Sequence, residues 1–260
     1  NMNVLESLKI NTIKNIALEA GNIIMDVYRT ENFADDIDYK ADNSPLTIAD
    51  ERSHHYIVEQ LKNIYPEIPL ISEEGKDIPY EKRKQWEHFW LVDPLDGTKE
   101  FIKRNGQFTV NIAFVSGGQP LLGVIYAPDR NELFYAKKGE GAFKQNSSGE
   151  IEILEVNKKS KELIGVRSRS HGAPEEETIF SKYGVAEFAS MGSSLKFCMV
   201  AEGKADVYYR HHPTMEWDTA AGQAIVEEAG GHVYHGMEEK EAFSYNKESL
   251  RNGSFLCLGW

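Results

Sequence analysis

Residues 90–101 read Trp-Leu-Val-Asp-Pro-Leu-Asp-Gly-Thr-Lys-Glu-Phe, and this stretch combines an apolar strand end, a tight turn and a pair of acids. The apolar residues at its start predict the end of a strand. Pro94 and Gly97 then enforce a turn, because proline fixes φ and glycine tolerates strained backbone. Asp93 and Asp96 lie on either side of Pro94, so their side chains can converge on one point.

Two converging carboxylates repel each other unless a cation lies between them. Oxygen ligands of this kind suit Mg²⁺, and the carbonyl of Leu95 offers a further oxygen. Thr98 is expected to begin a short helix whose free N–H groups favour an anion. A metal site beside such a helix start is typical of phosphate hydrolysis. Because Asp-Gly is also a common turn dipeptide, a plain surface loop is the alternative at this point.

Composition excludes several classes of protein. The chain has 260 residues, of which 41% are hydrophobic and 27% charged, as in an ordinary globular protein of one large domain or two packed lobes. Its formal net charge of −12 argues against nonspecific binding of nucleic acid. A phosphate-binding enzyme with this charge needs local cations at its site. No apolar run approaches the roughly 20 residues that span a bilayer, and the N-terminus lacks the pattern of a signal peptide.

Cys198 and Cys257 both lie within apolar segments. We expect them to be small buried thiols, which favours a cytoplasmic location.

The first half of the chain predicts long helices and an antiparallel sheet. Apolar spacing indicates helices over 4–28 and 47–65. The second of these opens with a capping box in form, in which Asp50 can reach back to the N–H of Thr47. Turn signals between apolar runs predict an antiparallel meander over 108–115, 121–127 and 133–137.

The second half alternates strand-like and helix-like segments, which predicts a mostly parallel sheet covered by helices. The predicted strands are 163–167, 187–190, 205–209, 232–234 and 255–258, and the predicted helices are 175–183, 195–202 and 219–229. Polar segments at 145–149 and 157–162 indicate a boundary. We therefore expect an N-terminal lobe of residues 2–158 and a C-terminal lobe of residues 159–260.

Two further stretches carry acids. Residues 69–75 predict a brief strand that runs into Glu73, Glu74 and a glycine turn, for which a solvated loop is the alternative. Residues 217–231 predict a helix with Asp218 at its N-cap position and a glycine pair at its end. Either Asp218 only caps this helix, or it is a metal ligand that the second lobe brings to a cleft between the lobes.

Three motifs together strongly resemble the signature of the inositol monophosphatase superfamily. They are Ser72-Glu-Glu74, Asp93-Pro-Leu-Asp-Gly-Thr98 and Trp217-Asp-Thr-Ala-Ala-Gly222, and their order and spacing fit over essentially the whole chain. The resemblance implies a Mg²⁺-dependent, lithium-sensitive phosphatase with the sugar-phosphatase fold. That fold is an α+β or α/β layered αβαβα sandwich, with an antiparallel sheet lobe followed by a mostly parallel one.

Other segments resemble the bacterial 3′(2′),5′-bisphosphate nucleotidase branch of that superfamily, namely residues 40–47, 98–106 and 192–203. Inositol monophosphatases usually have Thr-Asn-Phe where this chain has Lys99-Glu-Phe101. This implies hydrolysis of adenosine 3′,5′-bisphosphate to AMP and phosphate, a reaction of sulfur metabolism, with the phosphosulfate analogue as a further candidate substrate. The alternatives are an inositol or sugar monophosphatase with the same metal site, and a binder of metal or nucleotide without catalysis.

The resemblance also assigns roles to residues. It implies two or three Mg²⁺ ions per site, held by Glu73, Asp93, the Leu95 carbonyl, Asp96 and Asp218. Asp50 and Thr98 would together orient and deprotonate the attacking water, with Glu73 assisting. The metals would activate that water and stabilise the leaving oxygen. For Asp50, a purely structural role as a helix cap stays open.

A nucleoside bisphosphate also brings a phosphate that is held and not cleaved, and holding it needs cations away from the metals. The candidate substrate-binding residues are Gly97, Thr98, His171, Ser193, Ser194, Lys196 and Arg210. Ser193, Ser194 and Lys196 surround a predicted helix start, and His171 resembles a family position near the nucleotide. The alternatives are a solvated helix lysine at 196, a strand-end surface charge at 210 and an ordinary loop histidine at 171.

The expected partner is therefore a small nucleoside bisphosphate and not a nucleic-acid polymer. The resemblance is compatible with a monomer or a homodimer in the cytoplasm. Some relatives of this branch associate peripherally with the inner membrane, but no anchor for such association is visible in the sequence.

Overall fold

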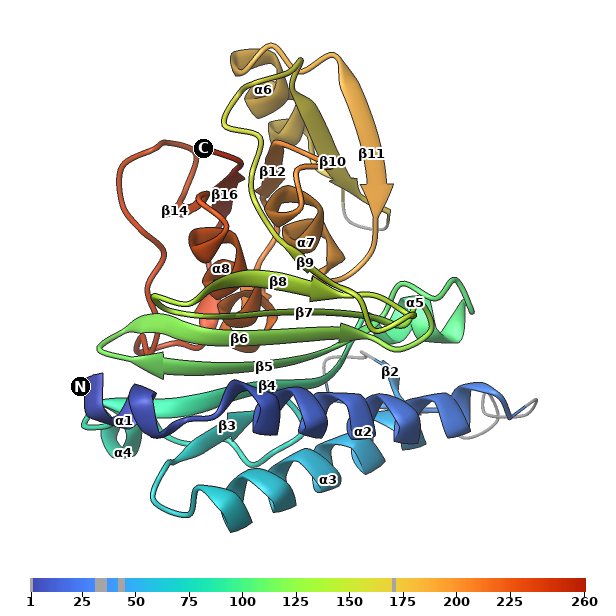
Figure 1. Cartoon of the computed structure of the whole chain (residues 1–260), viewed down its shortest axis with the longest axis vertical. Coiled ribbons are helices and arrows are strands. Elements are labelled where there is room, and N and C mark those ends of the chain that lie inside the picture. Colours follow the sequence, from blue (N-terminus) through green and yellow to red (C-terminus); the bar gives the residue numbers. More distant parts are fainter. Residues whose placement is uncertain (1, 31–36, 42–44, 170–171) are drawn as a thin grey trace.

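A computed structural model describes residues 2–30, 37–41, 45–169 and 172–260, and its elements stack in alternating layers (Figure 1). Helices α2 (Ile10–Tyr28) and α3 (Ile48–Ile64) form the first layer, and a seven-stranded sheet covers them. Helices α7 (Leu195–Ala201) and α8 (Glu216–Glu228) separate this sheet from a five-stranded sheet. Helix α6 (Pro174–Lys182) packs on the far face of the second sheet. The predicted αβαβα sandwich is confirmed.

The seven-stranded sheet follows the order of the chain. Its strands are β3 (Leu70–Ser72), β4 (His88–Asp96), β5 (Thr109–Ser116), β6 (Gln119–Ala127), β7 (Glu132–Lys137), β8 (Gly141–Gln145) and β9 (Ile151–Ile153). Only β3 and β4 pair in parallel, and every later pair is antiparallel, so the predicted meander is confirmed. Strand β5 is buried at every position, because helices cover both faces of the sheet at its centre.

The second sheet has the order β11-β10-β12-β16-β14. Its strands are β10 (Ile164–Ser168), β11 (Glu187–Met191), β12 (Val207–Arg210), β14 (His232–His235) and β16 (Phe255–Leu258). The prediction of a mostly parallel sheet is correct only for β10, β11 and β12. The last strand, β16, lies between β12 and β14 and is antiparallel to both, because it returns through a loop and not through a crossover helix.

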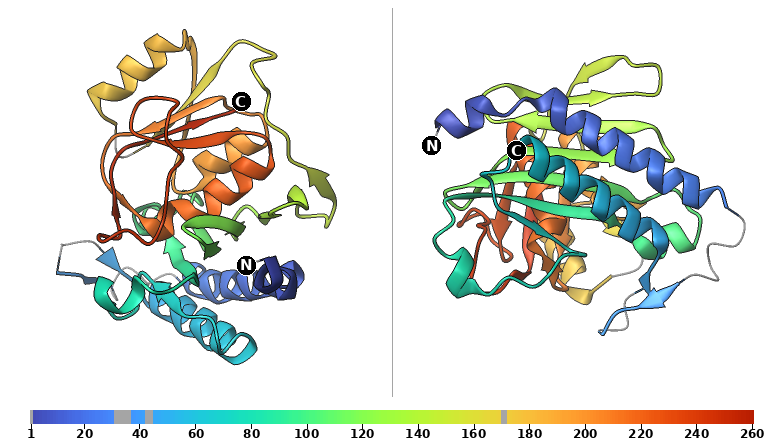
Figure 2. Two further views of the ribbon diagram at one scale, coloured as in Figure 1. Left: turned by 90° about the vertical axis from the view of Figure 1, so that its left-hand side faces the viewer. Right: turned by 90° about the horizontal axis from the view of Figure 1, so that it is seen from below.

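Two predicted helix boundaries are wrong. The helix predicted from residue 4 to 28 is divided into α1 (Met2–Ser7) and α2, because Lys9 is extended and its N–H donates to the Tyr65 hydroxyl at 3.3 Å. Helix α8 begins three residues earlier than predicted, with Met215 at the N-cap position. Asp218 is therefore inside the first turn and is not the N-cap. Figure 2 shows α2 and α3 side by side beneath the sheet.

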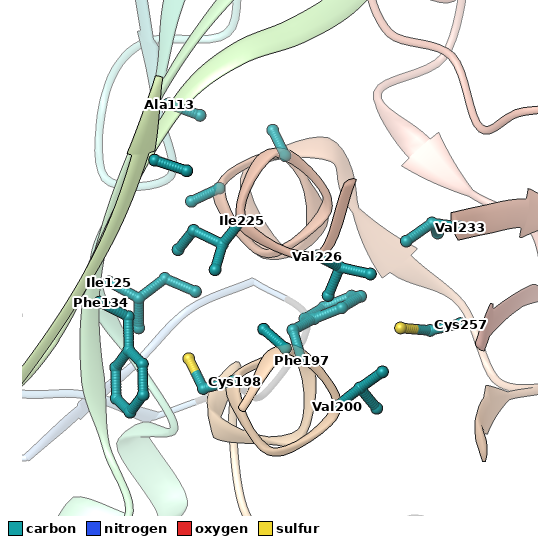
Figure 3. Packing of buried hydrophobic residues seen from close by; sticks show 14 of the residues in the cluster. Ala113, Ile125, Phe134, Phe197, Cys198, Val200, Ile225, Val226, Val233 and Cys257 are labelled. Carbon is teal, nitrogen blue, oxygen red and sulfur yellow. The ribbon is translucent and has the colours of Figure 1, made fainter. Parts of the chain in front are cut away.

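The core between the two sheets is continuous through α7 and α8 (Figure 3). Cys198 and Cys257 are free thiols in this core and are fully buried, which confirms that prediction. Helix α8 lies directly on the first sheet, since a Cβ at Gly123 of β6 would be only 2.5 Å from the Ala221 carbonyl oxygen. This close approach brings the first turn of α8 to the end of β4.

The remaining elements are short: β1 (Asp38–Tyr39), β2 (Pro45–Leu46), α4 (Tyr80–Arg83), α5 (Thr98–Ile102), β13 (Thr214–Met215) and β15 (Arg251–Asn252). The lobe boundary predicted after residue 158 falls in the connection between β9 and β10, and the division into two lobes stays a prediction. Within the described ranges, no helix is both long enough and apolar enough to cross a membrane.

Candidate metal and phosphate site

Three carboxylates from distant parts of the chain meet in the lining of one cavity. Glu73 follows β3, Asp93 lies within β4, and Asp218 lies in the first turn of α8. Each offers one oxygen atom, and these atoms all lie within 4.8 Å of one another. The fold therefore gathers acids that the sequence holds apart, and their role as metal ligands stays a prediction.

The end of β4 is shaped by a break in its pairing with β5. The register shifts between Asp93 and Asp96, so both acids keep a partner on β5 while the residues between them leave the ladder. The Ser53 hydroxyl of α3 donates to the Pro94 carbonyl at 2.8 Å and fixes this irregular segment from behind. Gly97 follows with a φ of 86°, a left-handed conformation that favours glycine. The helix predicted to begin at Thr98 is confirmed as α5.

Asp96 is held by Ser194, the residue before α7. The backbone N–H and the hydroxyl of Ser194 both donate to Asp96 Oδ2, at 2.8 and 2.5 Å. Asn111 Nδ2 approaches the same Oδ2 at 3.5 Å and donates to Ser194 Oγ at 2.5 Å. These contacts all lie on one side of the carboxylate and leave Oδ1 as the oxygen able to bind a cation. Ser194 donates to Asp96, and its contact with substrate stays a prediction.

Asp50 takes part in the predicted capping box and also accepts a hydrogen bond from Thr98, while its catalytic role stays a prediction. Its Oδ2 accepts from the backbone N–H of Thr47 at 2.9 Å and from the Thr47 hydroxyl at 2.6 Å, which completes the predicted capping box. Its Oδ1 accepts from the Thr98 hydroxyl at 2.9 Å. Burial raises the pKa of Asp50, and the hydrogen bonds from Thr47 and Thr98 oppose that shift. One carboxylate thus both caps α3 and fixes the hydroxyl that begins α5.

The electrostatics of the acidic cluster favour a hard cation. Burial raises the pKa of Asp93 well above its ordinary value, and the charges of Glu73 and Asp96 raise it further. Burial also raises the pKa of Asp218 to about 8, with added repulsion from Asp96 and Glu73. Such carboxylates ionise readily only beside a positive charge. Because all the donors are oxygens, the set fits a divalent ion such as Mg²⁺.

Lys40 provides a positive charge at the edge of this cluster. Its Nζ lies 3.2 Å from Glu73 Oε1 and 2.6 Å from Glu74 Oε1. Burial raises the pKa of Glu74 to about 7, although the hydrogen bond from Lys40 opposes the shift. Lys40 belongs to one of the segments that resemble the nucleotidase branch, but its contacts with Glu73 and Glu74 were not predicted.

Two cationic side chains, those of Lys196 and Arg210, line the same cavity. Lys196, in the first turn of α7, is only 3% exposed, which excludes the alternative of a solvated helix lysine. Its Nζ donates to the Met191 carbonyl at 3.2 Å. Burial lowers the pKa of Lys196 to about 8, and Arg210 lowers it further while Asp96 opposes the shift. Arg210 ends β12, lines the cavity and donates through Nε to the His212 carbonyl at 3.2 Å.

Ser193 is unusual in two respects. It has a left-handed φ of 52°, although it is not glycine. Its hydroxyl is one of the few buried side-chain polar atoms of the described residues that have no hydrogen-bond partner. A strained residue with an unsatisfied buried hydroxyl commonly marks a functional site.

Most of the predicted site residues line one cavity. They are Glu73, Asp93, Leu95, Asp96, Gly97, Thr98, Ser193, Ser194, Lys196, Arg210 and Asp218. Asp50 is 1% exposed and reaches the cavity through Thr98. His171 lies outside the described residues, so its predicted contact is not assessed. Lys40, Ser168 and Tyr208 line the cavity as well and were not predicted to do so.

Asn111 and Ser53 are supporting residues that the sequence analysis missed. Asn111 is a polar residue within the apolar run of β5, and that exception to the pattern is the signal that could have identified it. Ser53 lies one turn after Asp50 on α3 and is fully buried, yet a serine on an amphipathic helix carries no comparable signal.

Comparisons with known proteins agree with this geometry. A model of the inositol monophosphatase family matches residues 6–257. The chain is 46% identical over 241 residues to the 3′(2′),5′-bisphosphate nucleotidase CysQ of Escherichia coli strain K12, an alignment that covers 92% of this chain and 95% of that protein. It is 34% identical to the CysQ of Haemophilus influenzae, over 96% of this chain and 92% of the relative.

Solved structures of the same type are also similar. The crystal structure of CysQ from Bacteroides thetaiotaomicron superposes with a TM-score of 0.85 at 44% identity, and the match covers 97% of this chain and 98% of that one. An IMPase from Thermotoga maritima gives a TM-score of 0.76 at 25% identity, with 96% of this chain and 91% of that chain covered.

Proposed function

The chain belongs to the inositol monophosphatase family, and on that premise we propose that it removes the 3′-phosphate of adenosine 3′,5′-bisphosphate to give AMP and phosphate. The observation that carries this proposal is a single cavity lined both by a cluster of carboxylates and by cationic side chains. Glu73, Asp93 and Asp218 bring oxygen atoms within 4.8 Å of one another, and Lys196 and Arg210 line the same cavity. A substrate with a reacting phosphate and a second, retained phosphate suits this division.

We propose that the acidic end holds Mg²⁺ through Glu73, Asp93, the Leu95 carbonyl, Asp96 and Asp218. The all-oxygen donor set and the raised pKa values of Asp93 and Asp218 support this assignment. Bound Mg²⁺ would supply charge neutralisation for the phosphate and lower the pKa of a water molecule.

The protein itself provides a route for the proton of the attacking water. The Thr98 hydroxyl donates to Asp50 Oδ1, so the lone pairs of Thr98 Oγ1 can accept a hydrogen bond from water. Proton transfer from water to Thr98 Oγ1, with the Thr98 proton passing to Asp50 Oδ1, leaves hydroxide as the nucleophile. The raised pKa of Asp50 makes it a stronger base than an exposed aspartate.

The basic residues would bind the phosphate that is not cleaved. Lys196 is nearly inaccessible to bulk water, so an ammonium–phosphate contact there is stronger than one at the surface. Arg210 can add donors in a planar arrangement. The unpartnered hydroxyl of Ser193 gives the substrate a further donor within the same cavity.

The test is release of phosphate by purified protein in the presence of Mg²⁺. We expect kcat/KM for adenosine 3′,5′-bisphosphate to exceed that for inositol 1-phosphate. A higher kcat/KM for inositol 1-phosphate would instead favour the second candidate, an inositol or sugar monophosphatase that uses the same acidic cluster. Tight nucleotide binding without any phosphate release would indicate a binding protein and would overturn both.

A further inference from the structure

A buried charged cluster lies outside the cavity and behind Asp218. Glu216, in the first turn of α8, is 0% exposed. Its Oε1 accepts from the Asn246 backbone N–H at 2.7 Å, and its Oε2 accepts from the backbone N–H and the Nζ of Lys247 at 3.1 and 2.6 Å. A carboxylate is tolerated at such depth only when it is paired and hydrogen-bonded, as Glu216 is.

Residues 246–248, which include the partners of the Glu216 carboxylate, are in turn held by Arg83. Arg83 of α4 is 2% exposed, and its Nη1 donates to Asn246 Oδ1 and the Lys247 carbonyl at 2.8 and 2.6 Å. Its Nη2 donates to the Glu248 carbonyl at 2.7 Å, and Asn246 Nδ2 donates back to the Arg83 carbonyl at 2.9 Å. Asn246 has a left-handed φ of 64°, and its N–H and the next one both donate to the same carboxylate.

These contacts determine where α8 begins. The backbone N–H of Glu216 donates to the Leu250 carbonyl at 2.9 Å, so both its main chain and its side chain are fixed to residues 246–250. Asp218 Oδ2 accepts from the Met215 N–H at 2.8 Å. Because Met215 and Asp218 lie on either side of Glu216, the direction of the Asp218 carboxylate depends on the position of Glu216.

We infer that Glu216 and Arg83 are positioning residues that hold Asp218 at the distance from Glu73 and Asp93 needed to share a metal ion. Neither Glu216 nor Arg83 lines the cavity, so both act through the first turn of α8. The inference rests on the proposed function only in taking Asp218 as a metal ligand. Removal of the Glu216 contacts frees this turn and separates Asp218 from its neighbours.

The experiment is a calorimetric titration with Mg²⁺ and no nucleotide. For Glu216→Gln we expect Mg²⁺ affinity to fall about 10–100-fold, the range typical of residues that orient metal ligands. At saturating Mg²⁺, KM for the nucleotide should be unchanged. The matched control is Glu202→Gln, because Lys144 Nζ of β8 donates to Glu202 Oε2 at the end of α7 at 3.0 Å, in another ion pair between distant elements, with both side chains only 11% exposed. The control should keep wild-type Mg²⁺ affinity.

The variant Lys247→Met distinguishes the positioning of Asp218 from a change in the electrostatic potential at the metal site. Loss of a negative charge in Glu216→Gln and loss of a positive charge in Lys247→Met change the local potential in opposite directions. If only the potential mattered, Lys247→Met would bind Mg²⁺ more tightly. We expect weaker binding instead, by about 2–10-fold, because one of the bonds that hold Glu216 is lost. Lys247 has a 30% exposed side chain, so this variant tests the inference even if Glu216→Gln does not fold.

Wild-type or tighter Mg²⁺ affinity in Lys247→Met, or a folded Glu216→Gln with wild-type affinity, would overturn the inference. An equal loss of affinity in the Glu202→Gln control would overturn it as well, since it would indicate general loosening of the lobes. The titration contains no nucleotide. A wild-type protein that binds Mg²⁺ and releases no phosphate would therefore contradict the proposed function and leave this inference standing.

Discussion

The acidic and the basic residues of the site, called here its acidic end and its basic end without implying a separation in space, are built in opposite ways. At the acidic end, Asp50 and Asp96 each accept several hydrogen bonds from neighbouring residues. At the basic end, Lys196 Nζ makes one hydrogen bond to protein, and the Ser193 hydroxyl has no partner among the described residues. The acidic end is thus fixed in position before any ligand arrives, whereas the basic end keeps donors for a ligand.

On the proposed function, this difference follows from the different ligands of the two sets of residues. A metal site needs its ligand oxygens in a defined geometry, so each carboxylate is oriented by the residues around it. A phosphate can satisfy several donors at once, so the donors that bind it gain most when the protein does not already use them. Each of the following predictions tests one side of this division.

The largest effect is expected for Asp93→Asn. The substitution removes a charge from the centre of the acidic cluster, and we expect phosphate release to become undetectable because Mg²⁺ affinity is lost. The same change should stabilise the protein in the presence of a chelator. Burial raises the pKa of Asp93, so its ionised form disfavours folding at neutral pH. We expect Tm with chelator to rise by at least about 2 °C. Near-normal turnover at millimolar Mg²⁺ would contradict the role of Asp93.

Asp50→Asn should separate proton transfer from metal binding. Loss of a general base costs typically about 10²–10⁴-fold in rate, so kcat should fall within this range while Mg²⁺ affinity stays within about twofold. Thr47→Ala is the matched control, since it removes a capping partner of Asp50 and keeps the bond to Thr98. It should cost about 1 kcal/mol of stability and leave kcat unchanged. An equal loss of kcat in both variants would mean that Asp50 acts only as a cap.

The sequence predicts local features of this site well. The turn from Asp93 to Gly97 depends on neighbouring residues, and proline and glycine at fixed spacing determine it. The capping box of Thr47 and Asp50 is visible for the same reason. The order of the layers also follows from local patterns, because helical and strand periodicities differ. Each of these features requires only residues that are close in the chain.

Long-range contacts could not be predicted in this way. The bond from Ser194 to Asp96 joins residues 98 positions apart, and no spacing rule indicates that a serine will orient so distant a carboxylate. The start of α8 was misplaced for a similar reason, because the chain from Asn246 to Leu250 fixes Glu216 inside the helix. The resemblance to a known family, and not the periodicity, identified most of the site residues.

Lys196→Met should act mainly on binding of the retained phosphate. A hydrogen bond to a charged group contributes about 1.5–3 kcal/mol, so kcat/KM for adenosine 3′,5′-bisphosphate should fall about 10–100-fold through KM. A nucleoside 3′-monophosphate, which lacks the retained phosphate, is the matched control substrate and should be affected little. Equal losses for both substrates would show that Lys196 supports the structure of the cavity and not the second phosphate.

The same lysine gives the cavity a pH dependence. Because burial, and secondarily Arg210, lower the pKa of Lys196 to about 8, its ammonium form dominates below that pH and is lost above it. We expect kcat/KM for the bisphosphate to fall as pH rises above 8, by up to about tenfold per unit. Lys196→Met should lack this decline relative to its own value at pH 7. A decline of the same size in that variant would assign it to another group.

The smallest effects should come from two adjacent serines whose hydroxyls differ, because the Ser194 hydroxyl donates to Asp96 and the Ser193 hydroxyl has no partner among the described residues. Ser193→Ala removes a buried hydroxyl without a partner, so the free protein should be as stable as wild type or more stable, while KM for the bisphosphate rises about 2–10-fold. Ser194→Ala instead deprives Asp96 of one of its donors, so Mg²⁺ affinity should weaken by a similar factor while KM at saturating Mg²⁺ stays unchanged. Thermal unfolding, Mg²⁺ titration and steady-state kinetics on both variants measure the stability, the Mg²⁺ affinity and the KM. If both serines change KM and neither changes Mg²⁺ affinity, Ser194 binds substrate directly, and the separation between a fixed acidic end and an open basic end does not hold at this point of the chain.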